Sequence, residues 1–243
     1  MDIRITRVTL SVIADMRTLF LQQGGFQFIH DKCHRYGWAD TWLIEFKGEK
    51  AGYASVWGRE ERSARDTLFE FYLKPPYRDR AAEIFASALA VTEVPYLECQ
   101  TNDTLLFQMV LLHGRNIEAE AVLFADERES RLSLPGVRFA SQQPADTADH
   151  GGYCLLAEGE ERATGGFLTN YNFPYADLYM EVSESRRRQG YGSFFVQELK
   201  KEIYRQGYVP AARCNVRNSA SRATLLKAGF RICGMLLNGD VRR

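Results

Sequence analysis

The sequence predicts a mixed α/β protein with two similar halves, each a mixed, mostly antiparallel β-sheet flanked by helices. Three observations lead to this prediction. Short segments of β-type composition pair across Gly-containing turns, as in hairpins. Each hairpin is followed by segments that alternate between strand-like and helix-like apolar spacing. This order occurs twice, at a spacing of about 110 residues, and 243 residues are enough for two small domains.

The first half begins with the clearest hairpin. Two apolar segments, 42–46 and 51–57, flank the charged turn Lys47-Gly48-Glu49-Lys50, which is the pattern of a β-hairpin. Apolar residues at helical spacing between positions 80 and 91 predict a helix that packs on the sheet. The elements expected in this half are strands at 42–46, 51–57 and 68–73, a helix at 80–91, a strand at 96–99 and a helix at 104–112.

The second half repeats this order. Phe195, Leu199 and Ile203 stand four residues apart and predict an amphipathic helix. Between the halves, the segment 133–151 contains Pro135 and Pro144 and is interpreted as a connecting arm, so we expect domains at residues 1–136 and 137–243. The elements expected in the second half are strands at 152–157, 164–168 and 176–182, a helix at 193–206, a strand at 212–216 and a helix at 219–228.

Composition narrows the classes of function. Lys plus Arg and Asp plus Glu both number 31, so the balanced charge argues against a general attraction to nucleic acid or anionic lipid. No apolar run approaches the roughly 20 residues that span a bilayer. The five cysteines are widely spaced and include no CxxC pair, so we expect free thiols in a reducing cytoplasm and no metal site. The histidines are interpreted as structural or surface residues, although a Cys–His pair set by the fold stays open.

A glycine loop in the second half is the first feature that carries chemistry. A strand, the segment Arg187-Arg188-Gln189-Gly190-Tyr191-Gly192 and a helix follow one another. Successive backbone N–H groups at the start of a helix bind anions, and glycines let a phosphate approach the backbone. A solvated basic turn before a surface helix is the alternative, and the glycine spacing alone does not decide between them.

A second motif follows about 30 residues later. Residues 218–230 predict a helix with Asn218 as N-cap and Gly229 just past its end. Together the two motifs resemble the GCN5-related N-acetyltransferase (GNAT) superfamily. Its motif A ends a strand with Val-x-Pro-x-x-(Gln/Arg)-x-x-Gly-x-(Gly/Ala), and its motif B reads Asn-x-x-(Ala/Ser)-x-x-x-(Tyr/Leu)-x-x-x-Gly-Phe. The resemblance covers roughly residues 151 to 237, and a weaker one points to the FR47 branch.

The resemblance implies a site for acyl-CoA, most simply acetyl-CoA, where two parallel strands of the second half splay apart. The strand end at Val182 would pair with the pantetheine arm, and the glycine loop would hold the pyrophosphate. Asn218 and Ser221 would contact the pantetheine or phosphate side. The cofactor-binding residues so implied are Val182, Arg187, Arg188, Gln189, Gly190, Tyr191, Gly192, Ser193, Asn218 and Ser221.

The implied chemistry is direct transfer to an amine, which needs a base because an ammonium has no lone pair. Glu181 is the first candidate base and Asp177 the second, since both share one face of the predicted strand; either is alternatively an ordinary outward-facing acid. Two positions depart from the family pattern: Glu184 replaces Pro, and Leu225 replaces a Tyr that protonates the departing thiolate in many members. The general acid therefore stays open among two tyrosines, water or no group.

The first half resembles a degenerate copy of the same family. It keeps Pro75 and Arg78, but Ala81 and Glu83 replace both glycines, and a glutamate would repel a phosphate. Its counterpart of motif B, residues 102–114, lacks the final Gly-Phe. This half either shapes the acceptor site or serves only as scaffold.

The sequence thus predicts an N-acyltransferase that moves an acetyl or other short acyl group from acyl-CoA to a primary amine of a small molecule or peptide. The alternative is a non-catalytic acyl-CoA sensor or interaction module. Nucleic-acid binding through residues 186–188 is a third interpretation, which the zero net charge disfavours. We expect no nucleic-acid or membrane partner; the sequence does not identify the acceptor or the oligomeric state.

Overall fold

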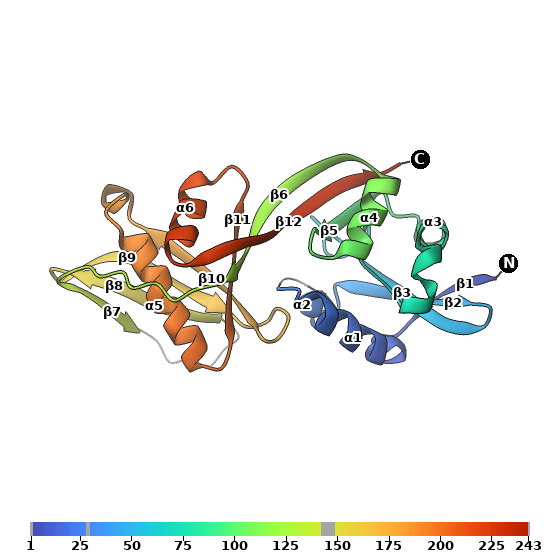
Figure 1. The fold of residues 1–243 in the computed structure, drawn as a ribbon, viewed down its shortest axis with the longest axis horizontal. Helices are drawn as coiled ribbons and strands as arrows, with labels where there is room; N and C mark the ends of the chain where they lie inside the picture. Colours follow the sequence, from blue (N-terminus) through green and yellow to red (C-terminus); the bar gives the residue numbers. More distant parts are fainter. Residues whose placement is uncertain (1, 28–29, 142–148, 243) are drawn as a thin grey trace. The chain divides into compact units, whose positions relative to one another are not determined.

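The computed structural model describes residues 2–27, 30–141 and 149–242. The chain forms two compact units: unit 1 is Met1–Glu120 with Met235–Arg243, and unit 2 is Ala121–Gly234. Both are mixed α/β units with a mostly antiparallel sheet flanked by helices, which confirms the predicted fold class (Figure 1).

Unit 1 has strand order β1-β2-β3-β4-β5-β12-β6. Among its strand pairs with a defined register, β4 and β5 are parallel and the others are antiparallel. Its helices pack on both faces of the sheet. Its elements are β1 (Ile3–Val8), α1 (Ala14–Gly24), α2 (His30–Arg35), β2 (Ala39–Phe46), β3 (Glu49–Trp57), β4 (Thr67–Leu73), α3 (Ala81–Thr92), β5 (Tyr96–Gln100), α4 (Thr104–His113), the first part of β6 (Gly114–Asp126) and the last part of β12 (Phe230–Val241).

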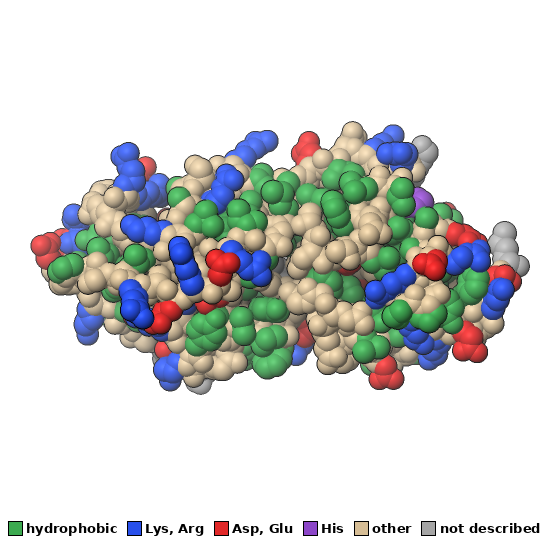
Figure 2. Space-filling view, viewed as in Figure 1, with side chains coloured by type: hydrophobic (Ala, Val, Ile, Leu, Met, Phe, Trp, Pro, Cys, Tyr) green, Lys and Arg blue, Asp and Glu red, His purple; other side chains and the backbone are tan. Residues whose placement is uncertain are grey.

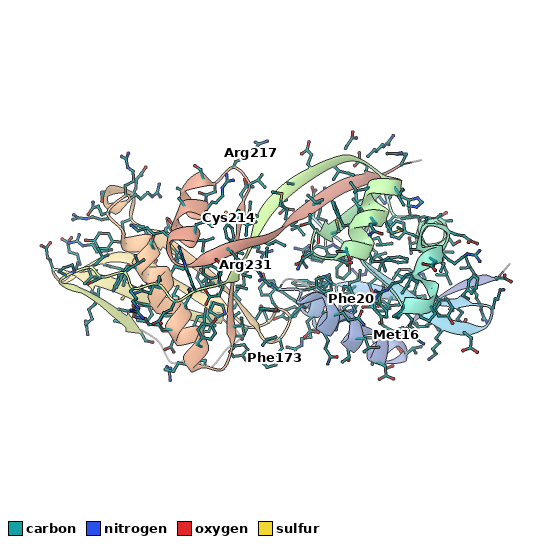
Figure 3. All side chains as sticks on the ribbon, in the orientation of Figure 1. Met16, Phe20, Phe173, Cys214, Arg217 and Arg231 are labelled. Carbon is teal, nitrogen blue, oxygen red and sulfur yellow. The ribbon has the colours of Figure 1, made fainter. Side chains whose placement is uncertain are left out.

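Apolar clusters lie on both faces of the unit 1 sheet. The helices α3 and α4 bury Ile84, Phe85 and Met109 against one set of strand side chains. Helix α1 contributes Met16 and Phe20, labelled in Figure 3, to a separate core. Because the side chains of a strand alternate between the two faces of a sheet, one helix pair covers each face.

Unit 2 has strand order β6-β11-β10-β9-β8-β7, with β10 and β11 parallel. Its core joins the sheet to α5 and α6, and α5 buries Phe195, Leu199 and Ile203 as the apolar spacing predicted. Its elements are β7 (Val137–Ser141), β8 (Asp149–Ala157), β9 (Glu160–Leu168), β10 (Tyr175–Val182), α5 (Tyr191–Arg205), β11 (Val209–Asn215) and α6 (Ser219–Lys227).

Each unit is completed by a strand segment from beyond its own half of the sequence. In unit 1, Leu236–Asp240 of β12 pairs with β5. In unit 2, β6 pairs with β11, from Ala125↔Ala211 to Ala121↔Asn215. The compact units therefore divide the chain differently from the expected boundary between residues 136 and 137, which stays a prediction for the functional domains. Pairing between distant segments is invisible to local pattern.

The expected connecting arm, 133–151, is partly wrong. Residues Val137–Ser141 form β7, which pairs antiparallel with β8, and the ring of Phe139 stacks on Tyr153 at 5.3 Å. The segment alternates apolar and polar residues, but the prolines on either side of it predict a loop. Pro144 lies outside the described residues.

A buried polar cluster occupies the α1–α2 side of unit 1. The carboxylate of Glu70 lies 3.5 Å from Arg17 Nη2 and 3.1 Å from His30 Nδ1, and its other oxygen is 3.2 Å from His34 Nε2. Burial alone would raise the pKa of Glu70, but His34 and Arg17 hold it well below its usual range. Burial lowers the pKa of His30, which favours the neutral ring. The histidines are thus structural.

His30 and His34 stand four residues apart on one helix, a spacing that zinc sites also use. Within the described residues, no group of three or more His, Cys, Asp or Glu side chains could hold a metal ion. All five cysteines have free thiols.

The described helices include none that is long and apolar enough to cross a membrane. On the face seen in Figure 2, basic and acidic side chains are interspersed, as the balanced composition suggests.

Candidate cofactor site

The parallel strands β10 and β11 of unit 2 separate after a short paired stretch. Their register covers only Tyr175↔Val209, Ala176↔Pro210 and Asp177↔Ala211. Beyond this point β10 continues paired only to β9, as far as Val182, and β11 continues paired to β6. The splayed parallel pair predicted from the resemblance is therefore present, and the carboxyl end of β10 borders the opening.

Helix α5 starts beside this opening with free backbone donors. Its N-cap is Gly190, and no side chain caps it. The first N–H bonded within this turn is that of Phe194, which donates to the carbonyl of Gly190 at 3.1 Å. The N–H groups of Tyr191, Gly192 and Ser193 precede it, so the helix presents three donors and the positive end of its dipole to an anion.

The two glycines of the loop are required for different reasons. Gly190 has φ 90°, in the left-handed region that favours glycine. At Gly192 the constraint is space, because a Cβ there would lie 3.2 Å from Thr224 Cγ2 and 3.3 Å from Met180 Cε. The first glycine turns the chain into α5, and the second lets α5 pack closely against α6 and β10.

A cavity of about 690 Å³ lies over these donors and brings most of the predicted cofactor-binding residues together. Nine of the ten line it; the exception is Gln189, whose Nε2 donates to the carbonyl of Ser185 at 3.3 Å. The lining residues are Met180, Glu181, Val182, Arg186, Arg187, Arg188, Gly190, Tyr191, Gly192, Ser193, Asn218, Ala220, Ser221, Ala223, Thr224 and Lys227.

The charged side chains of the cavity are mostly basic. Arg186 pairs with Glu160 at 3.3 Å, and Arg187 Nε donates to the carbonyl of Val182 at 3.3 Å. Neither Arg188 nor Lys227 forms an ion pair with another described residue. An elongated ligand with several phosphate charges matches this surplus of positive charge and the uncapped helix, so the residues fit the phosphates of coenzyme A.

Helix α6 forms the opposite wall. Asn218 caps it, since its side-chain oxygen accepts from the N–H of Ser221 at 2.9 Å, which confirms the predicted N-cap. Sequence reasoning missed the rest of this wall: Ala220, Ala223, Thr224 and Lys227. Their spacing of three, four and seven residues places them on one helix face, and that spacing was the available signal.

The structure separates the two candidate bases. Glu181 is exposed and lines the cavity. Asp177 is buried and does not line it; its carboxylate lies 3.4 Å from Arg213 Nε, and Arg213 Nη2 donates to the hydroxyl of Tyr171 at 2.8 Å. Leu225 is buried in the unit 2 core. Only the first candidate therefore stands beside the glycine loop.

Comparisons with known proteins agree with this geometry. A profile described as "Acetyltransferase (GNAT) domain" matches residues 26–127, and one described as "FR47-like protein" matches residues 157–235. A search of curated proteins gives no significant match.

Three solved structures share the fold across nearly the whole chain. An acetyltransferase of the GNAT family from Colwellia psychrerythraea has a TM-score of 0.75 at 15% identity and covers 98% of this chain and 100% of its own. A GCN5-related N-acetyltransferase from Sphaerobacter thermophilus has a TM-score of 0.63 at 13% identity, covering 100% and 96%. A tandem GNAT protein from the clavulanic acid biosynthesis pathway has a TM-score of 0.62 at 10% identity, covering 99% of both chains.

The two profiles match successive parts of the chain, in unit 1 and in unit 2, and the fold likeness extends over both. The chain belongs to the GCN5-related N-acetyltransferase superfamily, as a tandem protein with an FR47-like second half.

Proposed function

We propose that this protein transfers an acetyl or other short acyl group from acyl-CoA to a primary amine by direct attack. Membership of the superfamily supports acyl-CoA-dependent N-acyl transfer in general. The observation that carries the finer proposal is the basic cavity of about 690 Å³ at the uncapped start of α5.

The chain's own groups would hold the cofactor. The N–H groups of Tyr191, Gly192 and Ser193 would donate to the pyrophosphate, and Arg188 would add a guanidinium donor. The edges of β10 and β11 that face each other across the splay would pair with the amides of the pantetheine arm. When bound, acyl-CoA would supply the activated thioester.

Glu181 is the proposed base. A primary ammonium with a pKa near 10.4 is mostly protonated at neutral pH, so a proton acceptor must stand close to the amine. Glu181 is the second-to-last residue of β10 and lines the cavity, where it can accept this proton directly or through water. Leu225 offers no proton to the departing thiolate, and a thiol with a pKa near 8.5 can take its proton from water.

Two measurements test this proposal. Isothermal titration with acetyl-CoA should show saturable binding, and a panel of small amines and peptide N-termini should give acetylated products by mass spectrometry. Glu181→Gln should lower kcat by about 10²-fold or more and leave acetyl-CoA affinity within about twofold, because the base acts on the amine. Unchanged kcat in this variant would remove Glu181 from the mechanism.

A non-catalytic acyl-CoA sensor is the second candidate. It is favoured by the buried Leu225 in place of a tyrosine and by the pairing of Asp177 with Arg213, which together leave one acid at the cavity. If acetyl-CoA binds and no amine of the panel is acylated, this candidate replaces the first. We also propose that the acceptor is an amine of a small molecule or peptide and that the protein acts in the cytoplasm.

A further inference from the structure

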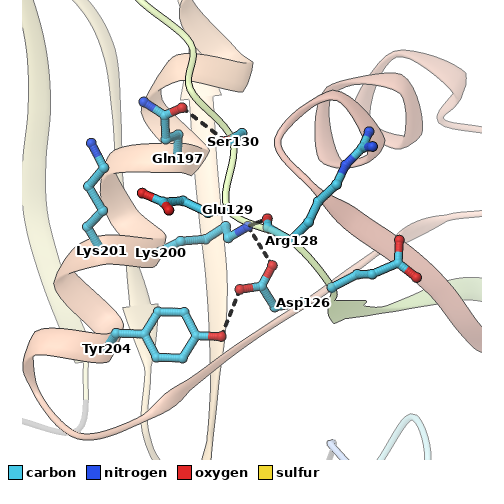
Figure 4. A pocket seen from close by; sticks show the side chains of 9 residues that line it. Asp126, Arg128, Glu129, Ser130, Gln197, Lys200, Lys201 and Tyr204 are labelled. Carbon is cyan, nitrogen blue, oxygen red and sulfur yellow. Dashed lines mark hydrogen bonds and ion pairs between the residues drawn. The ribbon is translucent and has the colours of Figure 1, made fainter.

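A second polar network lies on α5, where residues 127–134, here called the connector, run beside this helix (Figure 4). Gln197 of α5 is buried and holds the connector at three points. Its Oε1 accepts from Ser130 Oγ at 3.0 Å and from the N–H of Leu132 at 2.6 Å, and its Nε2 donates to the carbonyl of Leu132 at 3.1 Å. One side chain thus satisfies both backbone groups of Leu132 in a segment without secondary structure.

Lys200, one turn further along α5, is also buried and is held by two hydrogen bonds and one ion pair. Its Nζ lies 2.5 Å from Asp126 Oδ1 and donates to the carbonyls of Arg128 and Ala228, both at 2.9 Å. Tyr204 donates to the other oxygen of Asp126 at 2.8 Å. The buried ammonium thus has two carbonyl acceptors and one carboxylate of opposite charge, and such pairing is the condition for keeping a buried charge.

The same lysine fixes the end of α6. Ala228 is the C-cap of α6, so Lys200 binds a carbonyl at the negative end of that helix dipole. Gly229 follows with φ 93°, and a Cβ there would collide with the carbonyl of Arg128. The carbonyl of Gly229 accepts from the N–H groups of Glu127 and Arg128 at 3.2 and 3.1 Å. The connector, α5 and α6 are therefore joined at one point.

These segments also form the cavity. The start of α5 and one face of α6 line it, and Gly192 packs within van der Waals distance of Thr224. At its far end the connector reaches the glycine loop, since a Cβ at Gly190 would lie 3.6 Å from Leu134 Cδ2. Lys200 therefore links the two helices that line the cavity.

We propose that Lys200 and Gln197 are positioning residues for acyl-CoA binding, which act through the connector and through the spacing of α5 and α6. Neither side chain lines the cofactor cavity. The inference rests on the proposed function, because it concerns the same cavity.

The test compares Gln197→Ala and the double variant Lys200→Met/Asp126→Leu with Lys201→Met. The double variant removes both charges, because Lys200→Met alone would strand a buried carboxylate and could fail to fold. Lys201 is the matched control: it is the next residue, half-exposed, and pairs with Glu198 on the helix surface at 2.7 Å. Each protein is assayed well below its melting temperature, with acetyl-CoA binding by titration and steady-state kinetics on the best amine.

We expect both test variants to raise the KM and Kd for acetyl-CoA about tenfold, with kcat within about twofold, while Lys201→Met matches the unmodified chain. A merely structural role would lower the melting temperature and leave the Kd unchanged, and that result overturns the inference alone. If the unmodified chain does not bind acetyl-CoA, both the proposed function and this inference are wrong.

Discussion

The strand-to-helix loops of the two units share one backbone plan and differ in what stands at the start of the helix. In unit 1, Arg78 Nε donates to the carbonyl of Leu73 at 3.1 Å; in unit 2, Arg187 Nε donates to the carbonyl of Val182 at 3.3 Å. The same arginine thus ties the loop back to the end of its strand in both units. A common frame with one arginine anchor does not by itself make a phosphate site.

The difference lies in the first turn of the helix. In unit 1, Ala81 has ordinary helical angles, and Glu83 in the first turn of α3 accepts from Arg80 Nε at 2.8 Å. A carboxylate already stands where the helix attracts negative charge, and it is neutralised by its own neighbour. In unit 2 the corresponding positions are Gly190 and Gly192, and no side chain caps the backbone N–H groups at the start of α5.

The units also use their splayed strands differently. In unit 1, β4 and β5 pair in parallel only at Thr67↔Tyr96 and Leu68↔Leu97, and the next part of β4 carries the buried Glu70. In unit 2 the corresponding part of β10 borders the cavity. Unit 1 thus carries a buried ionic cluster on the α1–α2 side of this strand, and unit 2 has a ligand-sized cavity beside α5 and α6.

The largest expected effect comes from breaking the buried ionic cluster around Glu70. Glu70→Gln should destabilise the protein by about 3 kcal/mol, because removing one partner of a buried ionic network leaves the other charges uncompensated. Urea unfolding followed by circular dichroism measures this. Glu45→Gln is the control, since its partner Arg4 is 77% exposed and the pair spans 3.8 Å, and we expect a loss of about 0–1 kcal/mol there. Equal midpoints for both variants would contradict a stabilising role for the cluster.

The second effect comes from filling the open helix start. Gly190→Glu places a carboxylate at the phosphate donors and a side chain on a left-handed residue, so acetyl-CoA affinity should fall about 10²-fold. The reciprocal change, Ala81→Gly with Glu83→Gly in the Gly190→Glu background, should leave unit 1 without measurable binding, since Asp79 stands where unit 2 has Arg188. Thermal shift with acetyl-CoA reads both. Binding gained by the reciprocal variant would show that the glycines alone decide the difference.

Local patterns predicted much of this architecture because the relevant signals are local. Apolar spacing located α5, and the N-cap signal located Asn218. The strand segments that complete each unit were missed, since their partners lie more than a hundred residues away in unit 1 and almost as far in unit 2, as with Leu236↔Gln100. The face of α6 toward the cavity, including Lys227, was also missed, because a polar helix face predicts solvent as readily as a ligand.

The smallest effect concerns the N-caps that correspond in the two units, Asp103 and Asn218. Asp103 accepts from the N–H of Leu106 at 3.0 Å, and burial raises its pKa to about 7. Its pKa in the unfolded chain is near 3.9, so the folded state retains a proton between these values. The contribution of Asp103 to stability is therefore complete below about pH 4 and is lost as the pH rises toward 7.

Asp103→Asn makes unit 1 resemble unit 2 at this position, because asparagine caps a helix as well as aspartate and cannot ionise. The variant should be more stable than the unmodified chain by about 2 kcal/mol at about pH 5.5 and similar to it at about pH 4. Urea midpoints at both pH values give this difference, in which the titration of His30 cancels because both proteins carry it. A constant difference at the two pH values would mean that the buried Asp103 does not carry a proton in the folded state.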